Sequence, residues 1–228
     1  MKIIKRKKGN KYYFYLKYSF RENRNIVTKE IYLGKSIPKN IEEIKQKIEQ
    51  ENKRGLYKKL ERIKENFQKE WNKYPKSIKE KELQEIAIAF TYNTNAIEGS
   101  TITLPETREI IKDKVAPNKN LNDIKETEAH YKVFLRMLNK KEKISNELLL
   151  KRYKEIFEET KTEIAGRYRN YLVRVGSYIA PDWQDVKYLM NNLIGFCNKF
   201  KLNPVELAAR AHYKFESIHP FGDGNGRI

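Results

Sequence analysis

The sequence predicts a mainly α-helical protein, in which a small N-terminal β meander and a long helix precede a helical main domain. Apolar residues recur at helical spacing through most of the chain after residue 40. Several of these runs follow residues that cap helices, such as Ser145 or the pair Asn203-Pro204. Residues 11–20, in contrast, are rich in Tyr and Phe, as strands tend to be. At 228 residues the chain can bury the core of one main domain and still carry a small appendage.

Residues 1–38 are expected to form a small basic β unit. Residues 11–20 and 26–33 read as two strands on either side of a polar turn at 21–25, and residues 1–8 can add a third strand. Basic residues interleaved with tyrosines are compatible with nucleic-acid binding, because aromatic rings stack on bases while Lys and Arg contact phosphates. A basic, half-buried meander in a lysine-rich protein explains the same composition. We prefer that interpretation, because no recognised binding motif accompanies the charge.

Residues 39–75 are expected to form a long amphipathic helix that links the β unit to the main domain. Apolar residues recur at helical spacing from Ile41 to Phe67, this repeat is interrupted near Gly55, and Pro75 marks the boundary. The sequence leaves open whether this helix packs on the main domain or pairs with a second copy, so a homo-oligomer is one alternative. Residues 1–75 contain 22 Lys and Arg against 9 Asp and Glu, a net charge of +13. The remainder therefore carries only +5 of the chain's +18, and the basic character belongs mostly to the N-terminal third.

Residues 76–228 form the predicted helical main domain. Three helices are expected over residues 79–98, 122–138 and 204–218. Three more are expected to begin at caps: one at the Thr103–Glu106 capping box, one at Ser145 that ends at Phe157, and one at Asp182. The helix after Asp182 carries a core stripe from Val186 to Phe200. Two short β-prone runs around Gly176-Ser177 predict a hairpin. Both His130 and His212 are interpreted as structural, with His212 in the core.

The composition also bounds the location of the protein. No stretch approaches the length of a membrane span, and Lys5 to Lys8 stand where the apolar core of a signal peptide would begin. Cys197 is the only cysteine, so an intrachain disulfide is excluded, and its place in an apolar stripe makes it a small core residue. We therefore expect a cytoplasmic protein with no membrane partner.

The last ten residues, His219-Pro-Phe-Gly-Asp-Gly-Asn-Gly-Arg-Ile228, combine an imidazole, a carboxylate, three glycines and an arginine. Small residues let backbone N–H groups approach anionic oxygens, and an arginine can bind two of them at once. A carboxylate can hold Mg²⁺ together with phosphate oxygens, and histidine suits proton abstraction near neutral pH. The mixture favours the handling of a polyphosphate. A plain surface turn is the alternative on residue chemistry alone.

The full string resembles the signature His-x-Phe-x-(Asp/Glu)-Gly-Asn-(Gly/Lys)-Arg of the Fic family. The segment from Thr94 to Gly99 similarly resembles the family's inhibitory motif, (Ser/Thr)-x-x-x-Glu-(Gly/Asn). Weaker likenesses lie at the Gly-x-Tyr-Arg run that ends at Arg169 and at Pro181-Asp-Trp183. The resemblance covers residues 79–228 and does not extend to residues 1–75.

The resemblance implies a protein adenylyltransferase that moves AMP from ATP, with Mg²⁺, onto a hydroxyl of a target protein, which can be the enzyme itself. It assigns His219 as the catalytic base, Asp223 as the metal ligand, and Gly222, Gly224, Asn225, Gly226 and Arg227 to the nucleotide phosphates. Gly226 indicates AMP transfer, because relatives that phosphorylate their targets carry Lys there. Phe221 is expected to pack beneath the loop.

The same resemblance makes Glu98, with Thr94 and Gly99, an inhibitory element that occupies the space of the ATP γ-phosphate. The predicted hairpin becomes a flap that docks the target through Val173, Val175, Tyr178 and Ile179. Removal of AMP is a second reaction that the same glutamate supports in some relatives.

The sequence departs from the family in one respect. The family signature continues with a second arginine, three positions after Arg227, and with further helices, whereas this sequence ends at Ile228. We therefore expect these residues to be part of a longer protein. A nucleic-acid-binding or interaction protein with a basic N-terminal module and an inactive Fic remnant is the alternative function.

Overall fold

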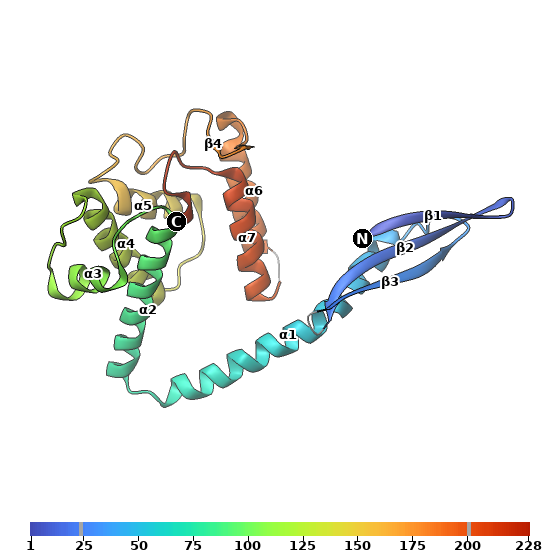
Figure 1. Cartoon of the computed structure of the whole chain (residues 1–228), viewed down its shortest axis with the longest axis horizontal. Helices are drawn as coiled ribbons and strands as arrows, with labels where there is room; N and C mark the ends of the chain where they lie inside the picture. The colour runs from blue at the N-terminus through green and yellow to red at the C-terminus, as the bar shows by residue number, and fades with distance from the viewer. Residues whose placement is uncertain (23–24, 200–201) are drawn as a thin grey trace. The chain divides into compact units, whose positions relative to one another are not determined.

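The computed structural model describes residues 1–22, 25–199 and 202–228. The chain divides into two compact units, residues 1–73 and residues 74–228, and each is described by itself (Figure 1). The predicted mainly helical fold, preceded by a β meander and a long helix, is confirmed. None of the helices in the described ranges is both long enough and apolar enough to cross a membrane.

The first unit begins with an antiparallel sheet of three strands in the order β1-β2-β3. The strands are β1 (Lys2–Lys8), β2 (Lys11–Glu22) and β3 (Asn25–Gly34). Residues 23–24 of the predicted polar turn lie outside the described residues. Leu16 of β2 is fully buried, and so is most of Ile48 in the helix that follows. That helix begins beside the sheet, and its first turns cover one face (Figure 1).

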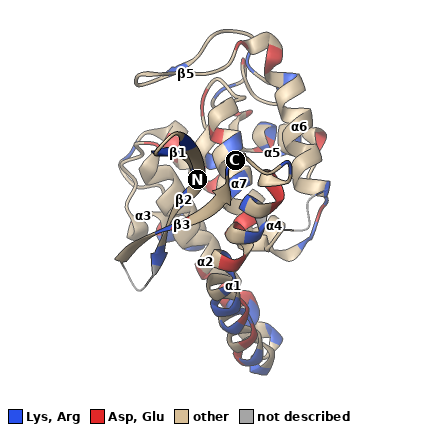
Figure 2. Cartoon of the chain, turned by 90° about the vertical axis from the view of Figure 1, so that its right-hand side faces the viewer, with Lys and Arg blue, Asp and Glu red and all other residues tan. Residues whose placement is uncertain are grey.

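The long helix α1 (Ile41–Lys73) continues through Gly55, where the apolar repeat is interrupted. A glycine inside a helix costs about 1 kcal/mol relative to alanine, which is not enough to break a helix of 33 residues. Acidic and basic side chains interleave along α1 (Figure 2). Pairs one turn apart stabilise it, each by roughly 0.2–0.5 kcal/mol, and include Glu42–Lys45, Glu49–Lys53, Glu61–Lys64 and Glu70–Lys73.

The second unit is built from helices. They are α2 (Lys76–Ile97), α3 (Leu104–Arg108) continued by a π-helical turn (Glu109–Asp113), α4 (Leu121–Asn139), α5 (Asn146–Phe157), a 3₁₀ turn (Trp183–Asp185) leading into α6 (Val186–Lys199), α7 (Pro204–Ile218) and a terminal 3₁₀ turn (Asn225–Arg227). The predicted caps at Thr103, Ser145, Asp182 and Asn203 are all present. α2 packs on α4, α4 on α5, and α6 on α7.

The core of this unit supports the end of the chain. Tyr153 and Phe157 of α5 pack with Phe221, and Val186, Met190 and Leu193 of α6 pack with Ile218. The predicted α6 stripe is thus confirmed as far as residue 199, and Phe200 lies outside the described residues. Cys197 packs at the edge of the same cluster, where burial raises the pKa of its thiol, as expected for a small core residue.

The prediction that His212 lies in the core is wrong, because its side chain is exposed. Ala211, Phe215 and Ile218 of α7 pack against α6 instead. His212 is not a core histidine.

Candidate active site

His219 lies where α7 ends. Its backbone N–H still donates to the carbonyl of Phe215 at 2.9 Å, but its own φ of 50° and ψ of 62° are left-handed. This conformation is unfavourable for a residue with a Cβ, by roughly 1 kcal/mol or more, so neighbouring contacts must hold it. The imidazole is largely enclosed, with 17% of its surface exposed, and its Nδ1 lies 3.9 Å from Glu216 Oε2. At that distance the carboxylate acts on the ring through charge rather than through a hydrogen bond.

Arg169 supplies contacts that hold the left-handed turn. Its Nε donates to the carbonyl of His219 at 2.8 Å, and its backbone N–H donates to the carbonyl of Pro220 at 2.9 Å. The other guanidinium nitrogens donate to the carbonyls of Tyr171 (2.8 Å) and Pro181 (2.6 Å), one on each side of the hairpin. Arg169 is 4% exposed. One buried side chain therefore ties the hairpin to the turn at His219 and Pro220, a role that the sequence did not reveal.

The loop after His219 is closed by side chains within the signature. Phe221 is fully buried and stacks on Tyr153 with ring centroids 3.8 Å apart, as predicted for a residue beneath the loop. Asn225 donates from Nδ2 to the carbonyl of Phe221 and accepts the N–H of Phe221 at Oδ1, both at 2.9 Å. The Asn225 amide is thus a clamp across the loop. Because its amide is used in this way, Asn225 can bind an anion only through its backbone N–H. Asn225 begins a 3₁₀ turn, and the first N–H groups of such a turn have no acceptor inside the turn.

Gly224 and Gly226 of the signature each leave room for a neighbouring side chain. Gly224 has a φ of +71°, and a Cβ on it would lie 2.5 Å from the Phe157 ring. A Cβ on Gly226 would lie 2.1 Å from Glu98 Oε1. The first glycine is fixed by backbone conformation and core packing. The second leaves room for a carboxylate at the surface of the turn.

The predicted inhibitory segment reaches the signature turn. The Thr94 hydroxyl donates to the carbonyl of Gly226 at 2.9 Å. Glu98 caps the C-terminal end of α2, and the chain then turns through Gly99 at a φ of +92°. The structure therefore brings Thr94 and the Glu98 carboxylate against Gly226, although more than 120 positions separate them in the sequence.

Four charged side chains form a network at the other side of the turn. Asp223 accepts the N–H of Gly224 at 2.6 Å, and its Oδ2 lies 3.3 Å from Lys161 Nζ and 3.7 Å from an Arg227 nitrogen. Both cations also pair with Glu126, which is almost fully buried. Burial by itself would raise the pKa of the Glu126 carboxyl, but hydrogen bonds from Lys161 and Thr160 and the charge of Arg227 hold it below its ordinary value. Glu126 is thus an anion that the sequence analysis did not identify.

The network holds the Arg227 side chain within the protein and does not leave it extended into solvent to bind a phosphate. Its guanidinium is 9% exposed, lies over the Phe157 ring at 4.7 Å and pairs with Glu126. Its Nε is buried and has no hydrogen-bond partner among the described residues. The Asp223 carboxylate, in contrast, is 47% exposed.

Asp223 is the residue of the turn whose carboxylate is available to Mg²⁺. Within the described ranges there is no cluster of three His, Cys, Asp or Glu side chains that could hold a metal by themselves. Mg²⁺ that arrives with a nucleotide needs less, because one or two carboxylates complete a shell made of phosphate oxygens and water. The exposed Asp223 carboxylate fits such a cation. Binding of the cation would weaken the ion pair between Asp223 and Lys161.

The hairpin consists of β4 (Arg174–Val175) and β5 (Tyr178–Ile179), which are shorter than the runs that predict them. Val175, Tyr178 and Ile179 are exposed. The Tyr178 hydroxyl donates to the carbonyl of Ser217 at 2.6 Å, two residues before His219. Val173, which is half-buried, accepts the N–H of Ala180 at 3.1 Å and closes the base of the hairpin. The predicted docking residues therefore stand on a short hairpin that contacts the last turn of α7, two residues before His219.

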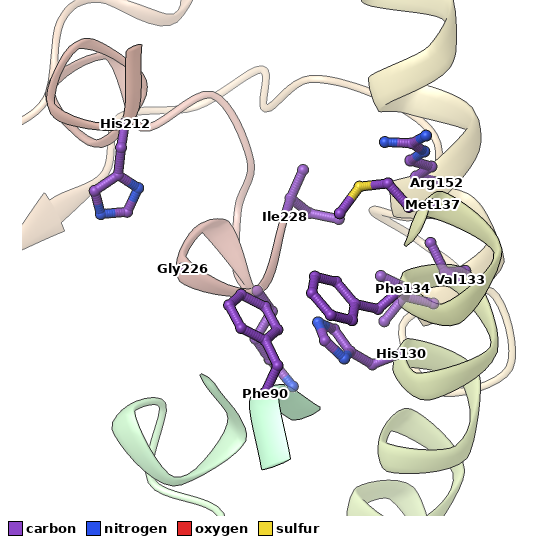
Figure 3. A pocket seen from close by; sticks show the side chains of 11 residues that line it. Phe90, His130, Val133, Phe134, Met137, Arg152, His212, Gly226 and Ile228 are labelled. Carbon is purple, nitrogen blue, oxygen red and sulfur yellow. The ribbon is translucent and has the colours of Figure 1, made fainter. Parts of the chain in front are cut away.

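A cavity of about 180 Å³ adjoins the terminal turn, with walls from α2, α4 and Gly226 to Ile228 (Figure 3). The rings of Phe90 and Phe134 stack at 4.1 Å, and His130 stacks beside them. Burial lowers the pKa of His130 to about 4, and the charge of Arg227 acts in the same direction. Its Nδ1 lies 2.8 Å from the Thr91 hydroxyl, and its ring also bonds the backbone of Arg227. His130 is therefore a neutral, structural histidine that supports the signature turn.

Comparison with known proteins matches residues 143–228 to the Fic/DOC family. The protein adenylyltransferase Fic of Culex quinquefasciatus is 35% identical over 152 residues, which cover 63% of this chain and 30% of that protein. That of Nematostella vectensis is 35% identical over 160 residues, which cover 67% and 36%. The chain thus spans about a third of the length of these curated relatives.

Solved structures show the same relationship. A fragment of Fic-1 from C. elegans superposes with a TM-score of 0.62 at 29% identity and covers 76% of this chain and 54% of its own. A Fic domain containing signaling protein from Bacteroides thetaiotaomicron gives a TM-score of 0.60 at 27% identity and covers 72% and 68%. The family signature is folded into one loop, and residues 143–228, which contain it, belong to the Fic/DOC family.

Proposed function

We propose that this protein is a protein adenylyltransferase that transfers AMP from ATP to a hydroxyl side chain of a target protein and is restrained by Glu98. The observation that carries the proposal is that His219, Asp223 and the glycine-spaced turn lie on one loop, which Arg169 and Tyr178 tie to the hairpin. The curated relatives are named protein adenylyltransferases, which supports the same reaction.

His219 acts as the general base in this proposal. The target hydroxyl loses its proton to the imidazole while its oxygen forms a bond to the α-phosphorus, and the bond from that phosphorus to the bridging oxygen breaks. Pyrophosphate leaves with the bonding electron pair. The Glu216 carboxylate, 3.9 Å from Nδ1, stabilises the positive charge that the ring gains. General base catalysis of this type contributes typically 10²–10⁴-fold.

The turn from Gly222 to Arg227 holds the phosphates. Gly222, Gly224 and Gly226 keep side chains away from the anion, and the backbone N–H groups of Asn225 and Gly226 begin the 3₁₀ turn without acceptors inside it. Arg227 adds positive charge from beneath the loop. Asp223 holds Mg²⁺, which supplies charge neutralisation on the phosphate oxygens when it is bound.

Glu98 restrains the reaction by occupying the phosphate side of Gly226. Its Oε1 lies 2.1 Å from the position that a Cβ of Gly226 would take, so an anionic phosphate that approaches this face meets both its volume and its charge. Thr94 holds the segment in place through its bond to Gly226. Gly99 lets the chain turn away at once after Glu98.

The hairpin presents the target. Strand addition along Val173 to Val175 would use main-chain hydrogen bonds and so accept varied side chains. Val175, Tyr178 and Ile179 provide exposed apolar contacts beside His219. The enzyme itself is one possible target, because its surface carries many hydroxyl side chains.

Incubation of the chain with ATP and Mg²⁺, followed by mass spectrometry for AMP adducts, tests the proposal. The wild-type chain should acquire AMP, or transfer it to proteins of a lysate, and His219→Ala should not. His212→Ala is the matched control, since His212 is an exposed histidine on the same helix, and it should react like the wild type. Equal labelling of the two histidine variants would refute the role of His219.

A further inference from the structure

The N-terminal sheet has one face that α1 covers and one that it does not. Side chains alternate between the two faces of a strand, so the face opposite buried Leu16 carries Tyr13, Tyr15 and Lys17 of β2. Contacts across the strands confirm this set. Tyr15 lies against Tyr32 with ring centroids 5.4 Å apart, and Arg6 bonds Glu30 at 2.9 Å. We call this surface, opposite Leu16, the outer face.

The outer face is strongly basic. By register it carries the six cations Lys2, Arg6, Lys8, Lys11, Lys17 and Arg21, all of them exposed. Among its described residues, Glu30 is the acidic one, and it pairs with Arg6. On α1, in contrast, bases alternate with acids that neutralise them (Figure 2). The positive charge of this unit therefore lies mostly on the sheet, and six of its cations are on the outer face.

Its dimensions and chemistry match one kind of partner. Three strands about 4.8 Å apart span roughly 10 Å, which fits a B-DNA major groove about 12 Å wide. The hydroxyl groups of Ser19 and Thr28 lie between the cations and are hydrogen-bonded to each other at 2.8 Å. In a complex they can form hydrogen bonds with the edges of bases instead. We propose that the outer face binds double-stranded DNA in the major groove, with its lysines and arginines on the flanking phosphates.

Other nucleic acids fit this face less well. A single strand would need free aromatic rings for base stacking. The Tyr15 ring, however, already has the Arg6 guanidinium at 5.0 Å on it and Tyr32 beside it. Double-stranded RNA has a major groove too narrow for a sheet. The proposal is independent of AMP transfer, because it uses residues of the first unit alone.

The test measures binding of the full chain to a fluorescent DNA duplex by anisotropy at several salt concentrations. The triple variant Lys8→Gln/Lys11→Gln/Arg21→Gln removes three outer-face charges. Each lost phosphate contact should reduce the magnitude of the slope of log K against log salt concentration by about 0.9. The slope of the triple variant should therefore be smaller in magnitude by about 2.7. The matched control Lys58→Gln/Lys59→Gln/Arg62→Gln removes the same charge from exposed positions of α1 and should keep the wild-type slope.

The outcomes separate the proposal from its rivals. Duplex binding that drops only in the outer-face variant, while both variants keep the wild-type circular dichroism spectrum, supports it. Equal losses in the two triple variants would mean attraction by net charge alone and would overturn it. Tighter binding of the single strand or of duplex RNA of the same sequence, or no salt-dependent binding, would overturn it as well.

Discussion

The hydroxyl of Thr94 donates a 2.9 Å hydrogen bond to the carbonyl oxygen of Gly226, across 132 positions of sequence. This bond joins the last turns of α2 to the loop that follows His219, the proposed catalytic base. It also sets where Glu98 lies, since one helical turn separates the two side chains on α2. The restraint proposed for Glu98 therefore depends on a contact that a single hydroxyl makes.

Removal of that hydroxyl should loosen the restraint. Thr94→Val keeps the shape of the side chain but loses the bond, at a cost of about 1 kcal/mol in the free energy of unfolding. We expect AMP transfer to rise by severalfold as the Glu98 segment moves away from Gly226. Thr94→Ser keeps the hydroxyl and serves as the control. Transfer rates of both variants and their urea unfolding curves provide the check, and an unchanged rate in Thr94→Val would separate Thr94 from regulation.

The two glycines beside Asn225 should respond differently to alanine. Gly226→Ala meets only the end of the flexible Glu98 side chain, so stability should change by less than about 1 kcal/mol while the carboxylate is pushed aside. Gly224→Ala combines a φ of +71° with a clash on the Phe157 ring, and should destabilise the protein by about 2 kcal/mol or more. Thermal unfolding of the pair measures the difference. Equal shifts in Tm would contradict the close approach seen at Phe157.

Arg169 should be needed for catalysis without touching substrate. Arg169→Lys retains the charge but cannot bond carbonyls of His219, Tyr171 and Pro181 together, because an ammonium group lacks the planar fork. We expect a loss of about 2–3 kcal/mol in stability and a fall in kcat larger than any change in the KM for ATP. Kinetics below the unfolding temperature distinguish this effect from loss of folded protein. A KM effect alone would instead assign Arg169 to nucleotide binding.

His130 makes stability sensitive to acid. Its pKa is about 4 in the folded protein against 6.5 ordinarily, so the unfolded chain takes up a proton that the folded chain refuses. The contribution is full above pH 6.5 and decreases as the pH falls toward 4, by up to about 3 kcal/mol. Unfolding free energies across this range should fall less steeply for His130→Gln than for the wild type. His212→Gln, which changes an exposed histidine, should leave the profile as it is, and a matching effect there would remove His130 from the explanation.

Local features of this chain were predictable from the sequence, because they depend on neighbours within one helical turn. The Thr103–Glu106 capping box and the Asn203-Pro204 helix start are examples, and both are present. The signature loop was also predictable, since its order of residues is itself the signal. The continuity of α1 through Gly55 was not predictable in this way, because the rest of the helix determines whether a penalty of about 1 kcal/mol for glycine breaks it.

Contacts between distant segments could not be predicted. Glu126 and Arg227 are 101 positions apart, and nothing in the pattern around Glu126 distinguishes it from a solvated helix charge. Arg169 stands in a recognisable run, but its partners are backbone carbonyls, which carry no sequence signal. His212 was misplaced because a shift of one residue in a helical stripe reverses whether a side chain is buried.

The most direct measurement of the central claim is AMP transfer from radiolabelled ATP by Glu98→Gly, with and without His219→Ala, alongside the affinity of both variants for ATP. The account predicts that Glu98→Gly labels more strongly than the wild type. It also predicts that the double variant binds ATP equally well and transfers none. Labelling by the double variant at the rate of Glu98→Gly would contradict the assignment of His219 as the base, and with it the proposed enzyme.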